Sequence, residues 1–342
     1  MSASRVPLSV LDLSVLVDGA SSADALATTT ALARRADQLG FTRFWVAEHH
    51  NMPSVACTAP TVLIAHLAAL TERIRLGSGG VMLPNHAPLV VAEQFAMLEA
   101  MHPNRIDVGI GRAPGTDQST AAALRRSPDT RGADDFPQQL IDLMGLLGDP
   151  RTERGMWDRF RATPAATTHP QVFLLGSSGF SAQLAGQLGL AFGFAHHFDM
   201  GGTLQAADLY RSSFRPSATL VAPYMIVTAN VLVAETAEEA DWHGAPGRLT
   251  ALGRRTGRFI PLPSPTDSSR HPDIDQANRL PSNRIIGDPA GAVAQLESLA
   301  ERTAADELMV TAVAYDLSAR VRSLELLAEH WGLAQPEQLQ AC

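Results

Sequence analysis

Histidines, serines, glycines and one arginine gather in five short clusters of the 342-residue chain, each directly after an apolar segment. Imidazole titrates near neutral pH and suits proton transfer, whereas hydroxyls, free backbone N–H groups and a guanidinium suit an anion such as phosphate. Clusters that follow successive strands of one sheet lie at the same edge, so five of them predict one shared pocket. The clusters are Glu48–Asn51, Gly77–Gly80, Gly109–Gly115, Gly176–Ser181 and His196–Asp199.

Three serines and an arginine form the candidate anion site. Ser177, Ser178 and Ser181 stand where a predicted strand gives way to a predicted helix, whose first N–H groups and dipole favour negative charge. Arg112, one strand earlier, offers planar, bidentate binding to phosphate. Ser178 alone is also explained as a plain N-cap, but together the four residues favour a phosphate site.

Two glycines and four histidines could take part in the rest of the pocket. Gly79 and Gly80 carry no side chain, so a flat ring can lie against their backbone, although a tight turn is an alternative explanation. We interpret His49 as the proton-transfer residue. We interpret the other three as lining the substrate side: His50, His196 and His197.

The same histidines leave two alternatives open. With Asp199 they could in principle hold a metal ion, but their spacing lacks the His-x-His and helical His-x-x-x-His forms that metal sites often use. They could also serve only as structural hydrogen-bonding groups.

Eight short apolar segments separated by helical patterns must position these clusters. Such alternation predicts a parallel sheet, and eight units over this length favour a closed (β/α)8 barrel, a TIM barrel, whose working face lies at the carboxyl ends of the strands. The predicted strands are Val6–Leu13, Thr42–Ala47, Ile74–Gly77, Arg105–Ile110, Gln171–Leu175, Ala191–Ala195, Pro223–Val233 and Leu308–Val313.

One segment departs from this alternation. Residues 244–286 carry six prolines among many polar residues, which predicts an irregular insertion between strands seven and eight of a single domain spanning 1–342. We interpret it as a lid over the active face; a solvent loop without a role is the alternative.

Composition excludes several classes of function. The formal net charge is −8, with 35 acidic and 27 basic residues, which argues against nucleic acid as a partner. The chain has no lysine, so Schiff-base, pyridoxal-phosphate and P-loop chemistry are excluded. Two cysteines make no disulfide framework, and we find no signal peptide and no apolar run as long as a membrane span. We therefore expect a cytoplasmic protein with no membrane partner.

Several of these segments, taken together and in order, resemble the bacterial luciferase-like flavin monooxygenases. The resemblance covers most of the chain outside residues 244–286. The segments that carry it are Phe44–His50, Ile74–Pro84, Glu93–Phe95, Arg105–Arg112, Leu175–Ser178, Gly287–Pro289 and Asp306–Val310.

The resemblance implies a (β/α)8 barrel, a non-covalently bound reduced flavin, usually FMN, and a homodimer. By position, His49 matches the family's catalytic histidine, and Gly79–Gly80 matches a pair joined by a non-proline cis peptide against the flavin ring. Arg112 matches the arginine that holds the flavin phosphate, and Ser177, Ser178 and Ser181 match the phosphate-binding segment.

Two residues depart from the family pattern. Gly111 stands beside the flavin where some members carry a cysteine, so no thiol role is available there. Pro114 takes a flavin-facing position that is often aliphatic.

The leading hypothesis is therefore a monooxygenase that oxygenates a small organic substrate with O2 through a C4a-peroxyflavin. Reduced FMN would come from a separate flavin reductase, since no Gly-x-Gly-x-x-Gly follows a strand in a βαβ context. Three rivals remain open: an F420-dependent hydride-transfer enzyme of the same superfamily, a metal-dependent hydrolase built on the paired histidines, and a flavin-binding or partner subunit without activity.

Overall fold

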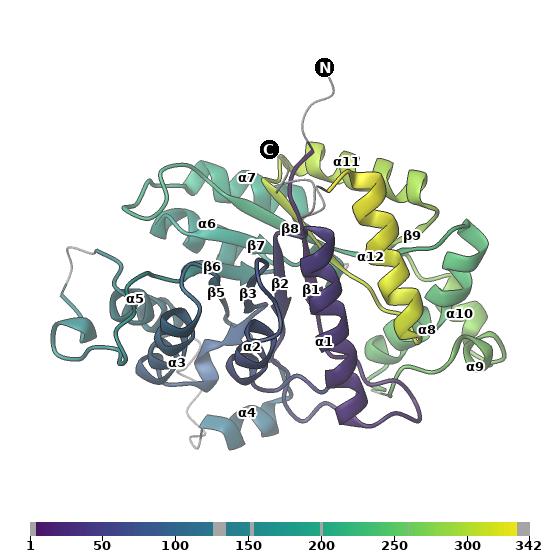
Figure 1. The fold of residues 1–342 in the computed structure, drawn as a ribbon, viewed down its shortest axis with the longest axis horizontal. Helices are drawn as coiled ribbons and strands as arrows, with labels where there is room; N and C mark the ends of the chain where they lie inside the picture. The colour runs from purple at the N-terminus through teal and green to yellow at the C-terminus, as the bar shows by residue number, and fades with distance from the viewer. Residues whose placement is uncertain (1–4, 126–134, 151–153, 199–200, 259, 334–342) are drawn as a thin grey trace.

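Eight parallel strands close into a barrel that helices surround (Figure 1). The computed structural model describes residues 5–125, 135–150, 154–198, 201–258 and 260–333. Strand β10 pairs with both β1 and β8, which closes the ring and confirms the predicted (β/α)8 barrel. The barrel strands are β1 Leu8–Asp12, β2 Arg43–Val46, β3 Arg75–Ser78, β5 Ile106–Gly111, β6 Gln171–Gly176, β7 Ala191–Phe194, β8 Met225–Val233 and β10 Glu307–Thr311.

Two further short strands extend the barrel wall. Strand β4, Val81–Met82, pairs with the end of β5, and β9, Ile285–Gly287, pairs with the outer half of β8. Strands β1, β5 and β8 are buried along their length, because one side faces the barrel interior and the other faces the helices.

Helices cover the outside of the barrel. None of those within the described ranges is long and apolar enough to cross a membrane. Pro60 and Pro88 open their helices, as the sequence indicated. The helices are α1 Ser22–Leu39, α2 Pro60–Ala68, α3 Pro88–Met101, α4 Gln118–Arg125, α5 Phe136–Leu146, α6 Gly179–Leu188, α7 Thr203–Ser213, α8 Ala237–Arg255, α9 Pro265–Ser269, α10 Ile274–Asn278, α11 Pro289–Thr303 and α12 Leu317–Trp331.

The segment 244–286 lies between the seventh and eighth barrel strands, as predicted, but it contains more helix than the sequence indicated. Helix α8 runs on to Arg255, and α9 and α10 pack beside it at the right of Figure 1. Thr236 caps α8, and buried Leu249 and Leu252 pack on Ala277 of α10. Burial of this apolar side stabilises a helix whose glycines have low helix propensity.

A buried ionic cluster closes the amino-terminal end of the barrel. The Arg43 guanidinium lies 2.8 Å from Asp107 Oδ2 and 3.0 Å from Glu307 Oε2, and Arg75 lies 2.6 Å from the other oxygen of Asp107. Trp45 Nε1 also donates to Asp107, at 3.0 Å. The cluster therefore fixes the Trp45 ring, which forms part of the cavity wall at the opposite end.

Candidate active site

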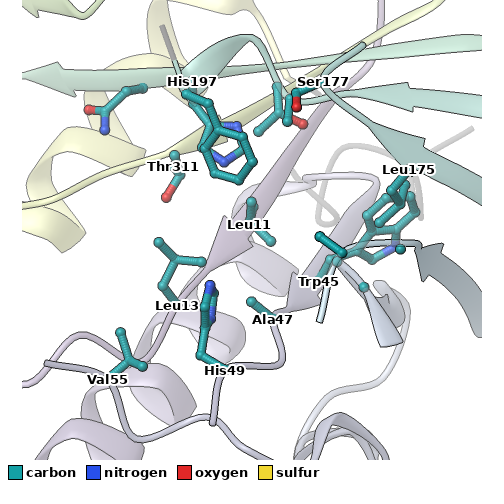
Figure 2. A pocket seen from close by; sticks show the side chains of 18 of the residues that line it. Leu11, Leu13, Trp45, Ala47, His49, Val55, Leu175, Ser177, His197 and Thr311 are labelled. Atoms are coloured by element: carbon teal, nitrogen blue, oxygen red, sulfur yellow. The ribbon is translucent and has the colours of Figure 1, made fainter. Parts of the chain in front are cut away.

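A cavity of about 520 Å³ lies at the carboxyl ends of the barrel strands (Figure 2). This volume falls within the roughly 300–1,000 Å³ of small-molecule and cofactor sites. Leu11, Trp45, Leu175 and Met309 make apolar parts of its wall. A large, mostly apolar cavity with a few polar groups is the usual form of a ligand site.

His49 follows β2 and points into this cavity (Figure 2). Burial lowers the pKa of His49; Glu48 opposes that effect, while His50 and Arg254 add to it. The ring is therefore neutral at pH 7. Its Nδ1 atom is buried and has no hydrogen-bond partner among the described residues, so it can bind a ligand or exchange a proton.

His197 enters the cavity from the side opposite His49 (Figure 2). Burial lowers the pKa of His197 to about 4. A hydrogen bond with the Thr228 backbone acts in the opposite direction but does not outweigh burial. His197 is thus also neutral at pH 7, and its buried Nδ1 likewise has no partner. Two neutral imidazoles with unused nitrogens face the same space.

The other two histidines assigned to substrate point elsewhere. His50 Nε2 lies 2.8 Å from Glu48 Oε1, and His196 Nδ1 lies 2.8 Å from the Thr203 hydroxyl. Neither contributes to the cavity wall. The expectation that His50 and His196 face the substrate is therefore wrong, because each is turned toward a polar partner outside the cavity.

The metal ligand set suggested by the sequence is not brought together. Asp199 lies outside the described residues. Within the described residues, the three groups close enough to share an ion are Glu48, His50 and His86. Both imidazoles hydrogen-bond the same carboxylate oxygen at 2.8 Å, so the group is already satisfied as a hydrogen-bond network.

The backbone of Gly79 and Gly80 forms part of the cavity wall, and the peptide bond between them is cis, as the family resemblance implied. A Cβ atom at Gly79 would lie 2.6 Å from Leu11 Cδ1, and one at Gly80 would lie 2.6 Å from the Gly109 carbonyl oxygen. Close packing on backbone therefore requires glycine at position 80, whereas at position 79 the Leu11 side chain would have to move, and the wall here is bare backbone.

The serines and Arg112 meet at one end of the cavity. Ser178 is the N-cap of α6, but its side chain makes no capping hydrogen bond, and we find no other partner for its hydroxyl among the described residues. The Arg112 guanidinium stacks 4.2 Å from the Phe180 ring, and in the described chain we find no acidic partner for it. These donors around a helix N-terminus fit a phosphate group.

Two smaller residues shape the same end. Ser181 is buried against Gly176, where a Cβ would lie 2.4 Å from the serine oxygen. Gly111 lies in the wall beside Met82, whose sulfur would be 2.9 Å from a Cβ at that position. Every residue that the sequence assigned to cofactor binding therefore contributes to this one cavity.

Comparison with known proteins agrees with this geometry. The model of the family described as luciferase-like monooxygenase matches residues 8–307. The chain belongs to the luciferase-like monooxygenase family. It is 41% identical to the luciferase-like monooxygenase of Escherichia coli K12, over 95% of this chain and 97% of that protein.

Two other matches bear on structure and chemistry. The N-acetyl-S-alkylcysteine monooxygenase of Bacillus subtilis is 38% identical over 75% of this chain and 76% of that protein. The crystal structure of apo-MsnO8 superposes with a TM-score of 0.88 at 36% identity, covering 97% and 99% of the two chains.

Solved structures with lower identity share only the fold with this family member. They include a 3,6-diketocamphane monooxygenase constituent in complex with FMN and an F420-dependent secondary alcohol dehydrogenase with an F420–acetone adduct. Their TM-scores are 0.70 and 0.68, and their identities are 19% and 15%. The matches cover 95% and 96% of this chain, and 97% and 99% of the two solved chains.

Glu48 ties together the two loops that carry His49 and the glycine pair. Its carboxylate accepts hydrogen bonds from His50 and His86 on one oxygen and from the Met82 N–H, at 3.0 Å, on the other. Burial alone would raise the pKa of Glu48, but these hydrogen bonds outweigh it and hold the pKa below its usual value. In this luciferase-like monooxygenase, Glu48 is therefore a charged acceptor that positions His49.

We expect Glu48→Ala to lower the free energy of unfolding by about 1–3 kcal/mol, because it leaves the Met82 N–H without its partner. Urea denaturation at pH 7 measures this. Glu301→Ala, on the exposed side of α11, is the matched control and should change stability far less. An equal effect of the two substitutions would contradict the role given to Glu48.

Among the polar wall residues that sequence reasoning missed is Arg254. It stands in the last turn of α8, within the segment interpreted as irregular. A helix signal was present: Thr236 as N-cap, Glu238 and Glu239 in the first turn, and Arg254 in the last.

Proposed function

We propose that this protein is a flavin-dependent monooxygenase that uses reduced FMN and O2 to oxygenate a small organic substrate. One observation carries the proposal: a single cavity brings together neutral His49, the bare backbone at Gly79–Gly80, and the anion-binding end at Arg112 and Ser178. Membership of the luciferase-like monooxygenase family supports the reaction class.

The cavity offers suitable groups for both the phosphate and the ring of FMN. Arg112, Ser177, Ser178 and the first N–H groups of α6 would hold the phosphate, and we find no partner for the hydroxyl of Ser178 among the described residues. The ring would lie in the wider part of the cavity, against glycine backbone and apolar side chains.

Reduced flavin supplies two electrons to O2, so that one oxygen atom enters the substrate and the other leaves as water. His49, neutral and with a free Nδ1, accepts or donates the proton beside the reacting atoms. The apolar wall excludes water from the reaction. We also propose that a separate reductase delivers the reduced flavin and that the enzyme works as a homodimer in the cytoplasm.

The named Bacillus relative suggests a first substrate class. An N-acetyl-S-alkylcysteine is a thioether that bears a free carboxylate, and the relative named for it shares 38% identity with this chain. We propose S-oxygenation of such thioethers here: substrate, O2 and reduced FMN would give sulfoxide, water and oxidised FMN.

An anaerobic titration of reduced FMN, followed by admission of ¹⁸O2 and N-acetyl-S-benzylcysteine, tests the proposed function. We expect one FMN per chain and a product that carries a single ¹⁸O atom by mass spectrometry. Substrate turnover without oxygen on reduced F420 would select the hydride-transfer alternative. Stoichiometric zinc or iron with no flavin affinity would select the hydrolase, and flavin binding without any turnover would indicate an inactive subunit.

We expect Arg112→Ala to weaken FMN binding by about 1.5–3 kcal/mol, the contribution of hydrogen bonds to a charged group, or about 10- to 150-fold in Kd. Fluorescence titration with FMN measures it. Riboflavin, which lacks the phosphate, should bind both proteins equally. The exposed Arg161→Ala variant is the charge-matched control. An unchanged FMN affinity in Arg112→Ala would remove the phosphate assignment.

A further inference from the structure

The cavity wall is positively charged although the chain is acidic overall. Among the described residues that form it, four are arginines and none is aspartate or glutamate. The whole chain carries a formal charge of −8. One arginine, Arg112, is accounted for by the phosphate of the cofactor. The other three are Arg254, Arg258 and Arg284.

Arg254 differs from the other two in its partners. Arg258 donates to Asp273 Oδ2 at 3.1 Å, and Arg284 also takes part in an interaction within the protein. For Arg254 we find no hydrogen bond or ion pair with the described residues. No carboxylate among the described residues raises its pKa. Arg254 thus presents a solvent-exposed guanidinium at the cavity wall, without a counter-ion among the described residues.

Arg254 and Arg112 contribute to the cavity from different elements. The charge of Arg254, on α8, acts on both His49 and His197 and lowers the pKa of each, whereas Arg112 is not among the groups that shift either one. Arg112 instead stacks on Phe180 of α6, beside the serines. The wall therefore carries positive charge in two places, and the phosphate of the proposed cofactor would use only the one at Arg112.

An arginine without a partner in the described protein keeps its N–H groups available, and a carboxylate can accept two of them in a planar, bidentate pair. We propose that Arg254 binds a carboxylate of the substrate and so selects anionic substrates over neutral ones. The inference rests on the proposed function, because it places the substrate beside the positive charge that the FMN phosphate leaves free. The unused Nδ1 atoms of His49 and His197 lie in the same cavity wall and offer further contacts to the polar groups of such a substrate.

Binding of an acid and its ester tests the proposal. Calorimetric titrations compare N-acetyl-S-benzylcysteine with its methyl ester, which has the same shape and no charge, on the protein with and without oxidised FMN. We expect the acid to bind wild-type protein about 10- to 100-fold more tightly than the ester. Arg254→Gln should abolish this preference, and Arg254→Lys should restore part of it.

A matched control and the FMN affinity make the result specific. Arg255→Gln removes a neighbouring charge on the same helix turn, outside the cavity wall, and should keep the preference for the acid. FMN affinity should be unchanged in Arg254→Gln.

Equal affinities of acid and ester in the wild type, no binding of the acid, or a preference that survives Arg254→Gln would each overturn the proposal. Weaker FMN binding in Arg254→Gln would overturn it too, because Arg254 would then belong to the phosphate site. If the wild-type protein does not bind FMN, the proposed function itself is rejected.

Discussion

Replacing His49 with alanine lowers turnover by about 10²- to 10⁴-fold, the usual contribution of a positioned acid or base. The imidazole lies in the cavity wall, and its Nδ1 has no partner among the described residues. We expect FMN affinity to change little, since Arg112 and the serines, not His49, would hold the phosphate in the proposed binding mode. Oxygen consumption with saturating reduced FMN, together with an FMN titration, measures both quantities.

The pH profile gives a second test of His49. Burial lowers its pKa below the usual 6.5, so the neutral ring predominates at pH 7 and is lost only in more acidic solution. If the neutral ring is the active form, kcat is constant near pH 7 and falls with acid at a pH below about 6.5. His66→Ala, exposed on α2, is the control and keeps both the rate and the profile. Full turnover in His49→Ala would contradict the assignment.

Arg43→Met lowers the free energy of unfolding by about 3–5 kcal/mol, the cost of removing one partner from a buried ionic cluster. Asp107 and Glu307 are both fully buried, and Arg43 bonds to each. Burial acts to lower the pKa of Arg43, but the two carboxylates outweigh it and raise the pKa above its usual value. Without this cation, the buried Glu307 carboxylate loses its ion pair, and Asp107 keeps only its pair with Arg75 among the described residues.

Urea denaturation at pH 7 measures the effect of Arg43→Met. Arg322→Met is the matched control, because it breaks an ion pair with Glu235 at the surface and should change stability much less. The tryptophan hydrogen bond gives a local readout: a loosened Asp107 should shift the emission of Trp45. Equal stability losses in the two variants would contradict the account of the cluster.

The barrel and the cofactor end could be predicted from the sequence because both depend on local pattern. Each strand is an apolar run with a polar cluster directly after it, and parallel strands place those clusters at one edge. This pattern predicts one pocket for Gly79, Arg112 and Ser178, and all three residues contribute to the wall of one cavity. The family resemblance added the cis peptide at Gly79–Gly80, which no spacing argument could supply.

The side-chain directions could not be predicted. His49 and His50 are neighbours in the sequence, yet His49 enters the cavity and His50 turns to Glu48. That choice depends on His86, which comes from a distant loop and shares the same carboxylate. Arg254 was missed for another reason: Gly253 and other glycines of α8 weaken its helical pattern, and tertiary packing on α10 decides its structure.

The two places where the cavity wall carries positive charge are built by different parts of the chain. Strand ends of the barrel carry the serines and Arg112, whereas Arg254 comes from α8, and the segment after it is hydrogen-bonded to the β1 loop through Leu262. Substitutions in that outer segment can therefore change which molecules are accepted while the residues around the isoalloxazine stay as they are. A directed-evolution library confined to 250–262 would alter selectivity and leave the redox chemistry in place.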